Sequence, residues 1–321
     1  MPGFEVIGAE EQAEIDDIFR RGGVLFRHGF DGIRNGCYKV RDFESAFAQY
    51  MGVPHALAVT SGTAALRVAL AALDLQPGDE VITQAFTFVA TAEAIIESRL
   101  VPVCCEVDDT LNMDPADLER RITSRTRAVI AVHMLGTPAR LREIKAICER
   151  HRLVLIEDAA WGCGGSLDNV RLGTWGRMGT FSFDFAKTMT TGEGGMVVFH
   201  ERADYERAAA WHDHGHENNP AVPRWEDTRS GSGFNYRMTE LQGAVGLAQL
   251  RKLDDVVRRQ RTNRDAMWRA IADLPGVTPR AVPAGSQETA DALVFEGPEA
   301  EIRSEEHTSE LQSRFGISYA V

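Results

Sequence analysis

The sequence predicts an α/β fold with a mostly parallel sheet covered by helices. Between about residues 40 and 200, short and nearly continuous apolar runs alternate with segments of helical period. Runs this uniformly apolar are typical of strands that are covered on both faces, as in parallel sheets. The expected strands are 55–59, 80–83, 101–107, 128–134, 153–158, 180–183 and 195–199.

Turn and capping residues mark the helices between these strands. An Ala/Leu-rich segment, 63–73, follows the first strand. Asp114 and Pro115 give an N-cap and a first-turn proline for a helix that runs to residue 122. We expect two further helices, one opened by Pro138 and running to about residue 150, and a long one over about 239–272.

Three regions follow from these signals. Residues 1–250 form a large domain with its N-terminal segment, and 251–302 hold a linking helix and the start of a smaller α+β domain, with a strand at 291–297. The segment 303–321 (RSEEHTSELQSRFGISYAV) has no clear period and resembles the translation of a common sequencing adapter. We therefore expect it to be a library artefact, with the native chain truncated near Ile302.

Composition excludes several classes of protein. The 321 residues are 26% charged, 44% hydrophobic and 8% aromatic, with a net charge of −12, which is typical of a globular chain. The acidic balance argues against a nucleic-acid or anionic-membrane surface, and no apolar run reaches the roughly 20 residues of a membrane span. The odd number of cysteines without a CxxC pair predicts reduced thiols in a cytoplasmic protein: Cys37, Cys104, Cys105, Cys148 and Cys163.

One lysine, Lys187, stands between an apolar strand and a glycine-rich turn in GTFSFDFAKTMTTGEGGMVVF (179–199). A lysine amine at a sheet edge forms a Schiff base when its surroundings lower its pKa. The glycines within 192–195 allow the backbone to approach closely. A solvated surface charge is the alternative, because that is the common role of lysine.

A second motif, LVLIEDAAWGCGG (153–165), ends a buried strand with Asp158. Carboxyl ends of strands in α/β sheets face the ligand crevice, and a buried carboxylate needs a cationic partner. The pyridinium nitrogen of pyridoxal 5′-phosphate (PLP) is such a partner. The alternative for Asp158 is the N-cap of a helix that starts at residue 159.

A third motif, ALAVTSGTAALRVAL (56–70), leads from a strand through Ser61, Gly62 and Thr63 into a helix. Free N–H groups, two hydroxyls and the positive helix end form a cup for a phosphate. The alternative is an ordinary hydroxyl cap.

The three motifs, in this order, resemble the sugar-aminotransferase family of PLP enzymes (DegT/StrS type, fold type I) over about residues 2–302. The resemblance implies that Lys187 holds PLP as a Schiff base and moves the proton between the amino donor and the cofactor. It implies that Asp158 pairs with the pyridine nitrogen. The further contacts that it implies are Ser182 with Gly62 and Thr63 on the phosphate, Phe88 on the ring face, and Asn235 on the phosphate of the neighbouring subunit.

The Asn235 contact implies a homodimer with shared active sites. Core packing is the alternative for Phe88, and a turn before a helix is the alternative for Asn235. The chain departs from the family at Trp161, where the family has a glutamine that donates to the ring oxygen of the cofactor. An indole offers one donor and no acceptor, so at best it replaces one hydrogen bond at a different reach.

The stretch HDHGHE (212–217) holds three alternating histidines, His212, His214 and His216. On a strand they would share a face, but no fourth metal ligand has a suitable spacing, so a loop lining the pocket is favoured over a metal site, with a solvated loop as the remaining alternative. With 2–8 and 22–36, this stretch resembles the subgroup that aminates the terminal carbon of an octulosonate sugar acid. Arg27 and Arg34 suit an acidic substrate, although ion pairs are the commoner use of arginine.

The sequence therefore predicts a PLP-dependent aminotransferase. By the resemblance, L-glutamate donates the amino group and a keto- or aldehydo-sugar accepts it, in cell-surface polysaccharide or secondary-metabolite biosynthesis. One alternative is a PLP-dependent sugar dehydratase, against which Lys187 argues, because that branch replaces the lysine. Another is a non-catalytic regulatory protein on the same fold, against which the acidic N-terminal segment without a DNA-binding module argues.

Overall fold

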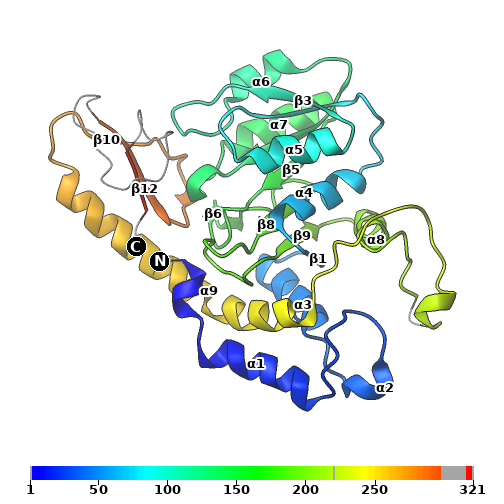
Figure 1. Cartoon of the computed structure of the whole chain (residues 1–321). Coiled ribbons are helices and arrows are strands. Elements are labelled where there is room, and N and C mark those ends of the chain that lie inside the picture. Colours follow the sequence, from blue (N-terminus) through cyan, green and yellow to red (C-terminus); the bar gives the residue numbers. More distant parts are fainter. Residues whose placement is uncertain (1, 220, 298–315, 320–321) are drawn as a thin grey trace.

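A computed structural model describes residues 2–219, 221–297 and 316–319 of the protein (Figure 1). The helices and 3-10 turns are η1 (Gly3–Val6), α1 (Ala9–Arg20), α2 (Asp31–Arg34), α3 (Lys39–Met51), α4 (Gly62–Ala71), α5 (Val89–Glu97), α6 (Pro115–Arg121), η2 (Met134–Gly136), α7 (Leu141–His151), α8 (Arg202–Trp211), η3 (Arg224–Glu226) and α9 (Glu240–Ile271). The strands are β1 (His55–Val59), β2 (Glu80–Gln84), β3 (Val101–Cys105), β4 (Thr126–Val132), β5 (Val154–Asp158), β6 (Ser166–Leu167), β7 (Val170–Arg171), β8 (Met178–Ser182), β9 (Gly195–Phe199), β10 (Thr278–Pro279), β11 (Ser286–Gln287), β12 (Ala292–Glu296) and β13 (Gly316–Tyr319).

The central sheet has seven strands in the order β1-β9-β8-β5-β4-β2-β3. Strand β9 runs antiparallel to both of its neighbours, and the other pairings are parallel. The carboxyl ends of β1, β2, β4, β5 and β8 therefore lie along one edge of the sheet. The expected strands of this sheet are all present, to within two residues at either end.

Apolar side chains cover both faces of the sheet, as the uniform apolar runs predicted. Along β1, Leu57 and Val59 pack with α4, α5 and α8, whereas Ala56 and Ala58 pack with α3 and α9. The same alternation in β4 directs one set of residues towards α4 and the other towards α6 and α7. The layered arrangement of helices around the sheet is seen in Figure 1.

Local capping chemistry sets the helix starts. Thr239 and Gln242 form a capping box at the start of α9, which is one continuous helix, as expected. Asp114 caps α6 by accepting from the N–H of Ala116 at 2.9 Å. Helix α7 begins three residues after Pro138, and the N–H of Ala139 in the intervening segment donates to the Nδ1 atom of the buried His133.

Beyond α9, strand β12 pairs with β10 and β13 in a small antiparallel sheet. The expected strand at 291–297 is thus present as β12. The expected artefact, 303–321, lies outside the described residues except for β13, so its origin stays a prediction. Within the described part of the chain, no helix is long and apolar enough to cross a membrane.

Candidate active site

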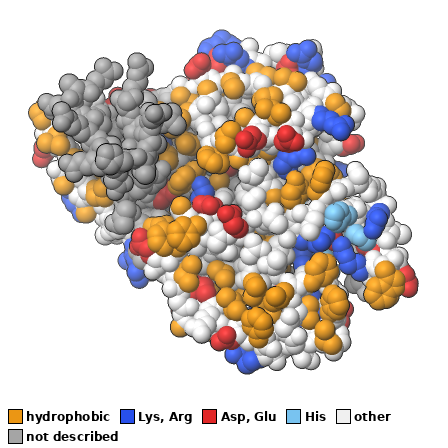
Figure 2. All heavy atoms as spheres, viewed as in Figure 1, with side chains coloured by type: hydrophobic (Ala, Val, Ile, Leu, Met, Phe, Trp, Pro, Cys, Tyr) orange, Lys and Arg blue, Asp and Glu red, His pale blue; other side chains and the backbone are white. Residues whose placement is uncertain are grey.

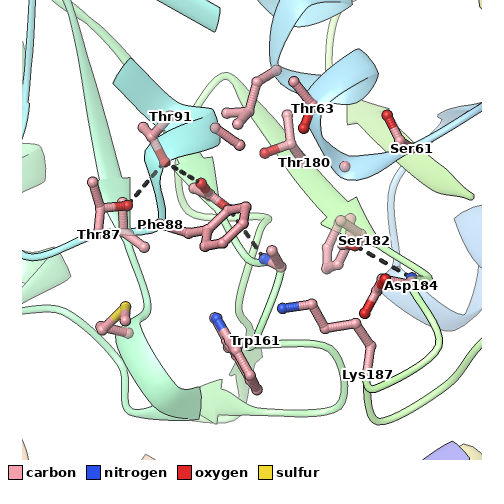
Figure 3. A pocket seen from close by; sticks show the side chains of 18 of the residues that line it. Ser61, Thr63, Thr87, Phe88, Thr91, Trp161, Thr180, Ser182, Asp184 and Lys187 are labelled. Atoms are coloured by element: carbon pink, nitrogen blue, oxygen red, sulfur yellow. Dashed lines mark hydrogen bonds between the residues drawn. The ribbon is translucent and has the colours of Figure 1, made fainter. Parts of the chain in front are cut away.

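The three sequence motifs meet at one edge of the sheet. Ser61 follows β1, Asp158 ends β5 and Lys187 follows β8, and these strands run in the same direction. A cavity of about 320 Å³ opens at this edge. Figure 3 shows the side chains that line it. From the predicted set it includes Ser61, Gly62, Thr63, Phe88, Asp158, Trp161, Ser182 and Lys187.

Lys187 projects its amine from the turn after β8 into this cavity (Figure 3). Burial lowers the pKa of the ammonium from its usual value, and the charges of Asp291, Asp158 and Asp184 oppose that shift. A lowered pKa supplies more of the free amine that attacks a carbonyl carbon. The alternative of a solvated surface lysine is therefore wrong.

Asp158 lines the cavity, where Oδ2 accepts from the Thr91 hydroxyl at 2.9 Å and Oδ1 accepts from the N–H of Ala160 at 3.2 Å. Burial raises the pKa of this carboxyl, and the two hydrogen bonds oppose that shift. No helix starts at residue 159, because the chain enters a turn, so the N-cap alternative is wrong. Asp158 has no salt-bridge partner within the described part of the chain, and such a buried carboxyl is suited to a cationic ring nitrogen.

A hydroxyl-lined cup faces the start of α4. The Ser61 hydroxyl caps the helix by accepting from the N–H of Ala64 at 3.0 Å. A Cβ on Gly62 would lie 2.7 Å from the Ser182 Cβ, so only glycine permits this close approach. On the other side, a Cβ on Gly195 would lie 2.3 Å from the Ser61 carbonyl oxygen. The glycine-rich turn thus permits the close backbone approach that the sequence predicted.

These features together fit a PLP-sized group. The helix start and the hydroxyls of Ser61, Thr63 and Ser182 suit a phosphate, and Asp158 suits a ring nitrogen. Lys187 lines the same cavity with an amine suited to a Schiff base. The fit rests on the close approach at Gly62, the buried carboxyl and the lysine in one cavity.

The sequence profile of the DegT/DnrJ/EryC1/StrS aminotransferase family matches residues 30–316. The chain belongs to this family. It is 36% identical over 234 residues to GDP-perosamine synthase of Vibrio cholerae, covering 73% of this chain and 62% of the synthase. It is 37% identical over 291 residues to dTDP-4-dehydro-2,3,6-trideoxy-D-glucose 4-aminotransferase of Saccharopolyspora spinosa, covering 87% of this chain and 73% of that enzyme.

Among solved structures, the sugar aminotransferase CalS13 from Micromonospora echinospora superposes with a TM-score of 0.82 at 28% identity, covering 92% of this chain and 79% of that one. The predicted family, the sugar aminotransferases of DegT/StrS type, and the predicted fold type I are both confirmed. The chain spans 62% of the length of the Vibrio cholerae synthase, which is less than two thirds.

Two aromatic residues line the cavity: Trp161, where the chain departs from the family, and Phe88, where the resemblance implies an aromatic residue. The Lys187 amine lies 3.4 Å from the centroid of the Trp161 ring, so the indole at the position of the family glutamine contacts the lysine directly. The Phe88 side chain is 68% exposed and lines the cavity, so the core-packing alternative is wrong. Its stacking on a cofactor ring stays a prediction.

Asn235 is exposed and lies outside this cavity. Its Oδ1 atom accepts from the N–H of Arg237 at 3.4 Å, and its backbone bridges to Asp213. Within one subunit it therefore does not join the Lys187 site. The expected contact with a neighbouring subunit stays a prediction.

The three histidines of HDHGHE do not share a face, because the segment forms turns and isolated bridges instead of a strand. His212 is buried against the carbonyl of Ala209, His216 lies 3.1 Å from Asp227, and His214 is exposed. They do not line the Lys187 cavity, so the pocket-lining interpretation is wrong. Among the residues that the structure describes, no group of three or more candidate ligands could hold a metal.

Arg27 and Arg34 are engaged inside the fold. Arg27 pairs with Glu44 at 2.6 Å. Arg34, only 1% exposed, pairs with Glu240 at 3.0 Å. The expectation that they meet an acidic substrate is wrong for Arg34, because its guanidinium is buried and already paired with Glu240.

Sequence reasoning missed the residues that support the motifs. Thr91 follows the Phe88 segment and donates to Asp158, and a hydroxyl on the first turn of a helix gave no distinctive signal. Asp291, at the start of the small sheet, lies near enough to Lys187 for their charges to interact, and its Oδ2 is buried without a hydrogen-bond partner among the described residues. Asp291 and Lys187 are about a hundred residues apart in the sequence, so their proximity leaves no local sequence pattern.

Proposed function

We propose that this protein is a PLP-dependent aminotransferase that moves an amino group from an amino acid to a keto- or aldehydo-sugar. The observation that carries the proposal is one cavity holding a lysine of lowered pKa and a buried aspartate below a hydroxyl-lined helix start. This set matches what PLP presents: an aldehyde, a ring nitrogen and a phosphate.

Each residue then has a separate task. Asp158, held by Thr91, would pair with the ring nitrogen and stabilise its protonated form, and in that form PLP would supply the electron sink for the reaction. Ser61, Gly62 and Thr63, with Ser182, hold the phosphate. Lys187 would anchor the cofactor through its amine and, once that amine is free, would hold and move the proton that passes between the amino donor and the cofactor.

The acceptor class is supported by the relatives. The two curated relatives described above are named for sugar nucleotides bearing GDP or dTDP. We propose a sugar in polysaccharide or secondary-metabolite biosynthesis as acceptor and L-glutamate as donor. The octulosonate type of acceptor rests on the resemblance of 2–8, 22–36 and the DHGH element to that subgroup. Both substrates are small molecules, and we propose a cytoplasmic location.

We further propose a homodimer in which Asn235 reaches the site of the neighbouring subunit. Its exposure outside the Lys187 cavity leaves it available for that role. Large exposed apolar residues near α1 and α2, such as Phe30 and Ile33, supply surface for an interface. Figure 2 shows hydrophobic side chains gathered over this lower part of the molecule.

The proposal is tested by adding PLP and then L-glutamate to the protein while recording its absorbance spectrum. We expect a visible band from the lysine-bound cofactor that bleaches with glutamate, together with one equivalent of 2-oxoglutarate. Lys187→Arg keeps the charge, and we expect neither the stable band nor the bleaching. A band that forms equally in Lys187→Arg would contradict the assignment of the lysine. A band in the native protein that no amino acid bleaches would contradict the transamination.

A further inference from the structure

The turn that carries Lys187 is contacted by the beginning of the described chain. In η1, the N–H of Gly3 donates to the Lys187 carbonyl oxygen at 2.9 Å. A Cβ on Gly3 would lie 2.8 Å from the Cα of Met189 and 2.9 Å from the nitrogen of Thr190. These are backbone atoms of the lysine turn, so a side chain at this position would have to displace them.

The next residue reinforces this contact. The ring of Phe4 stacks on that of Phe185 with centroids 4.3 Å apart and an interplanar angle of 11°. Phe185 lies two residues before Lys187 and is 55% exposed. An exposed ring on the lysine turn is thus covered on one side by Phe4.

Helix α9 contacts both this segment and the turn that carries Lys187. The Lys252 amine donates to the Val6 carbonyl at 2.7 Å. The Gln249 side chain accepts from the N–H of Thr190 at 3.3 Å and donates to Glu11 at 2.9 Å. The segment and the lysine turn are therefore both fixed to the same helix, which spans 32 residues.

We propose that η1 is a positioning strap, in which Gly3 and Phe4 set the place of the Lys187 amine in the cavity. The inference rests on the proposed function in one respect, the role of Lys187 as the cofactor lysine. Neither Gly3 nor Phe4 lines the cavity, so both act through the lysine turn.

The local geometry explains why a strap is needed. The backbone N–H of Lys187 donates to the backbone carbonyl of Asp184 within the same turn at 3.1 Å, whereas the Lys187 carbonyl accepts from the N–H of Gly3. Ala186, like Phe185, is exposed, so the outer side of the turn faces water. Without the strap, the part of the turn around Lys187 would be less restrained, and its outward movement would expose the amine to water. The carboxylates that face this amine are Asp291, Asp158 and Asp184.

The test measures Lys187 in the protein without added cofactor. Trace acetylation followed by peptide mass spectrometry gives the labelling rate at each pH, and Lys145 serves as the internal reference. Burial lowers the pKa of Lys187, so release of the turn should raise the midpoint of its labelling curve. We expect an upward shift of about one pH unit in Gly3→Ala and in Phe4→Ala, which means about tenfold less free amine below the midpoint.

Matched substitutions provide the controls. Gly32→Ala adds the same methyl group where no atom lies within 4 Å. Phe19→Ala removes another exposed ring, on α1. Phe4→Tyr keeps the stacked ring. We expect all three to leave the Lys187 midpoint unchanged.

An unchanged midpoint in both Gly3→Ala and Phe4→Ala would overturn the inference, even if their melting temperatures fell. If Gly3→Ala does not fold, Phe4→Ala decides, because it removes a partly exposed ring without adding atoms. A failure of the proposed function looks different. The native protein would then form no band with PLP, while the labelling curves would still report on the strap.

Discussion

The first prediction tests whether the buried Arg34 stabilises the fold through its contacts with Glu240 and two backbone carbonyls. Its Nη2 atom donates to the Phe26 carbonyl at 2.8 Å and to Glu240 at 3.0 Å, and its Nη1 donates to the Arg27 carbonyl at 3.2 Å. Glu240 is the first residue of α9, and its carboxylate also accepts from the N–H of Val40 at 3.1 Å. The change Arg34→Met keeps most of the side-chain length but removes the charge and the three donated hydrogen bonds.

The magnitude follows from burial, since both side chains of the pair are 1% exposed. Burial raises the pKa of Glu240, whereas the charge of Arg34 lowers it. Removing the cation leaves the buried carboxylate with backbone donors. Breaking a buried pair in this way costs about 3–5 kcal/mol of unfolding free energy.

The assay is urea denaturation followed by far-UV circular dichroism, with Arg202→Met as the control. Arg202 pairs with Glu206 on the surface, where the side chains are 80% and 57% exposed, so we expect no measurable change in the free energy of unfolding. The double variant Arg34→Met/Glu240→Gln should recover about 1–3 kcal/mol of the loss, because the unpaired charge is gone. A loss below about 1 kcal/mol for Arg34→Met would refute the reasoning and return Arg34 to the list of substrate-binding candidates.

Two further predictions concern the cavity. Thr91→Val should weaken PLP binding about tenfold or more in a fluorescence titration, because a hydrogen bond to a charged group contributes about 1.5–3 kcal/mol. Thr91→Ser keeps the hydroxyl that donates to Asp158, so this variant should bind PLP as tightly as the native protein. Asp291→Asn should lower the midpoint of Lys187 labelling, because the Asp291 carboxylate stabilises the ammonium and raises its pKa. A midpoint that rises or stays unchanged in Asp291→Asn would show that the two charges do not interact.

The sheet and the central residues of the site were accessible to sequence reasoning because their signals are local. Each strand of the parallel sheet is an apolar run between turn residues, and Ser61, Asp158 and Lys187 each follow or end such a run. Parallel strands bring their carboxyl ends to one edge, so the order of the motifs already places them together.

The supporting residues were not accessible, because their partners are distant in sequence. Gly3 contacts a turn more than a hundred residues away, and Arg34 meets Glu240 at a separation of 206 residues. The interpretation of Arg34 as a substrate contact was wrong because an arginine in a glycine-rich segment gives no sign of its burial. The alternating histidines were misleading, because their period of two has meaning only on a strand.

The most direct test of the central claim is to trap the cofactor on the chain. The protein is loaded with PLP and reduced with borohydride, and its peptides are analysed by mass spectrometry. Reduction converts a lysine Schiff base into a stable secondary amine, so the mass of the bound cofactor marks the lysine that held it. We predict the added mass on the peptide of Lys187 and not on those of Lys39, Lys145 or Lys252. The mass on another lysine, or on none in folded protein, would contradict the account.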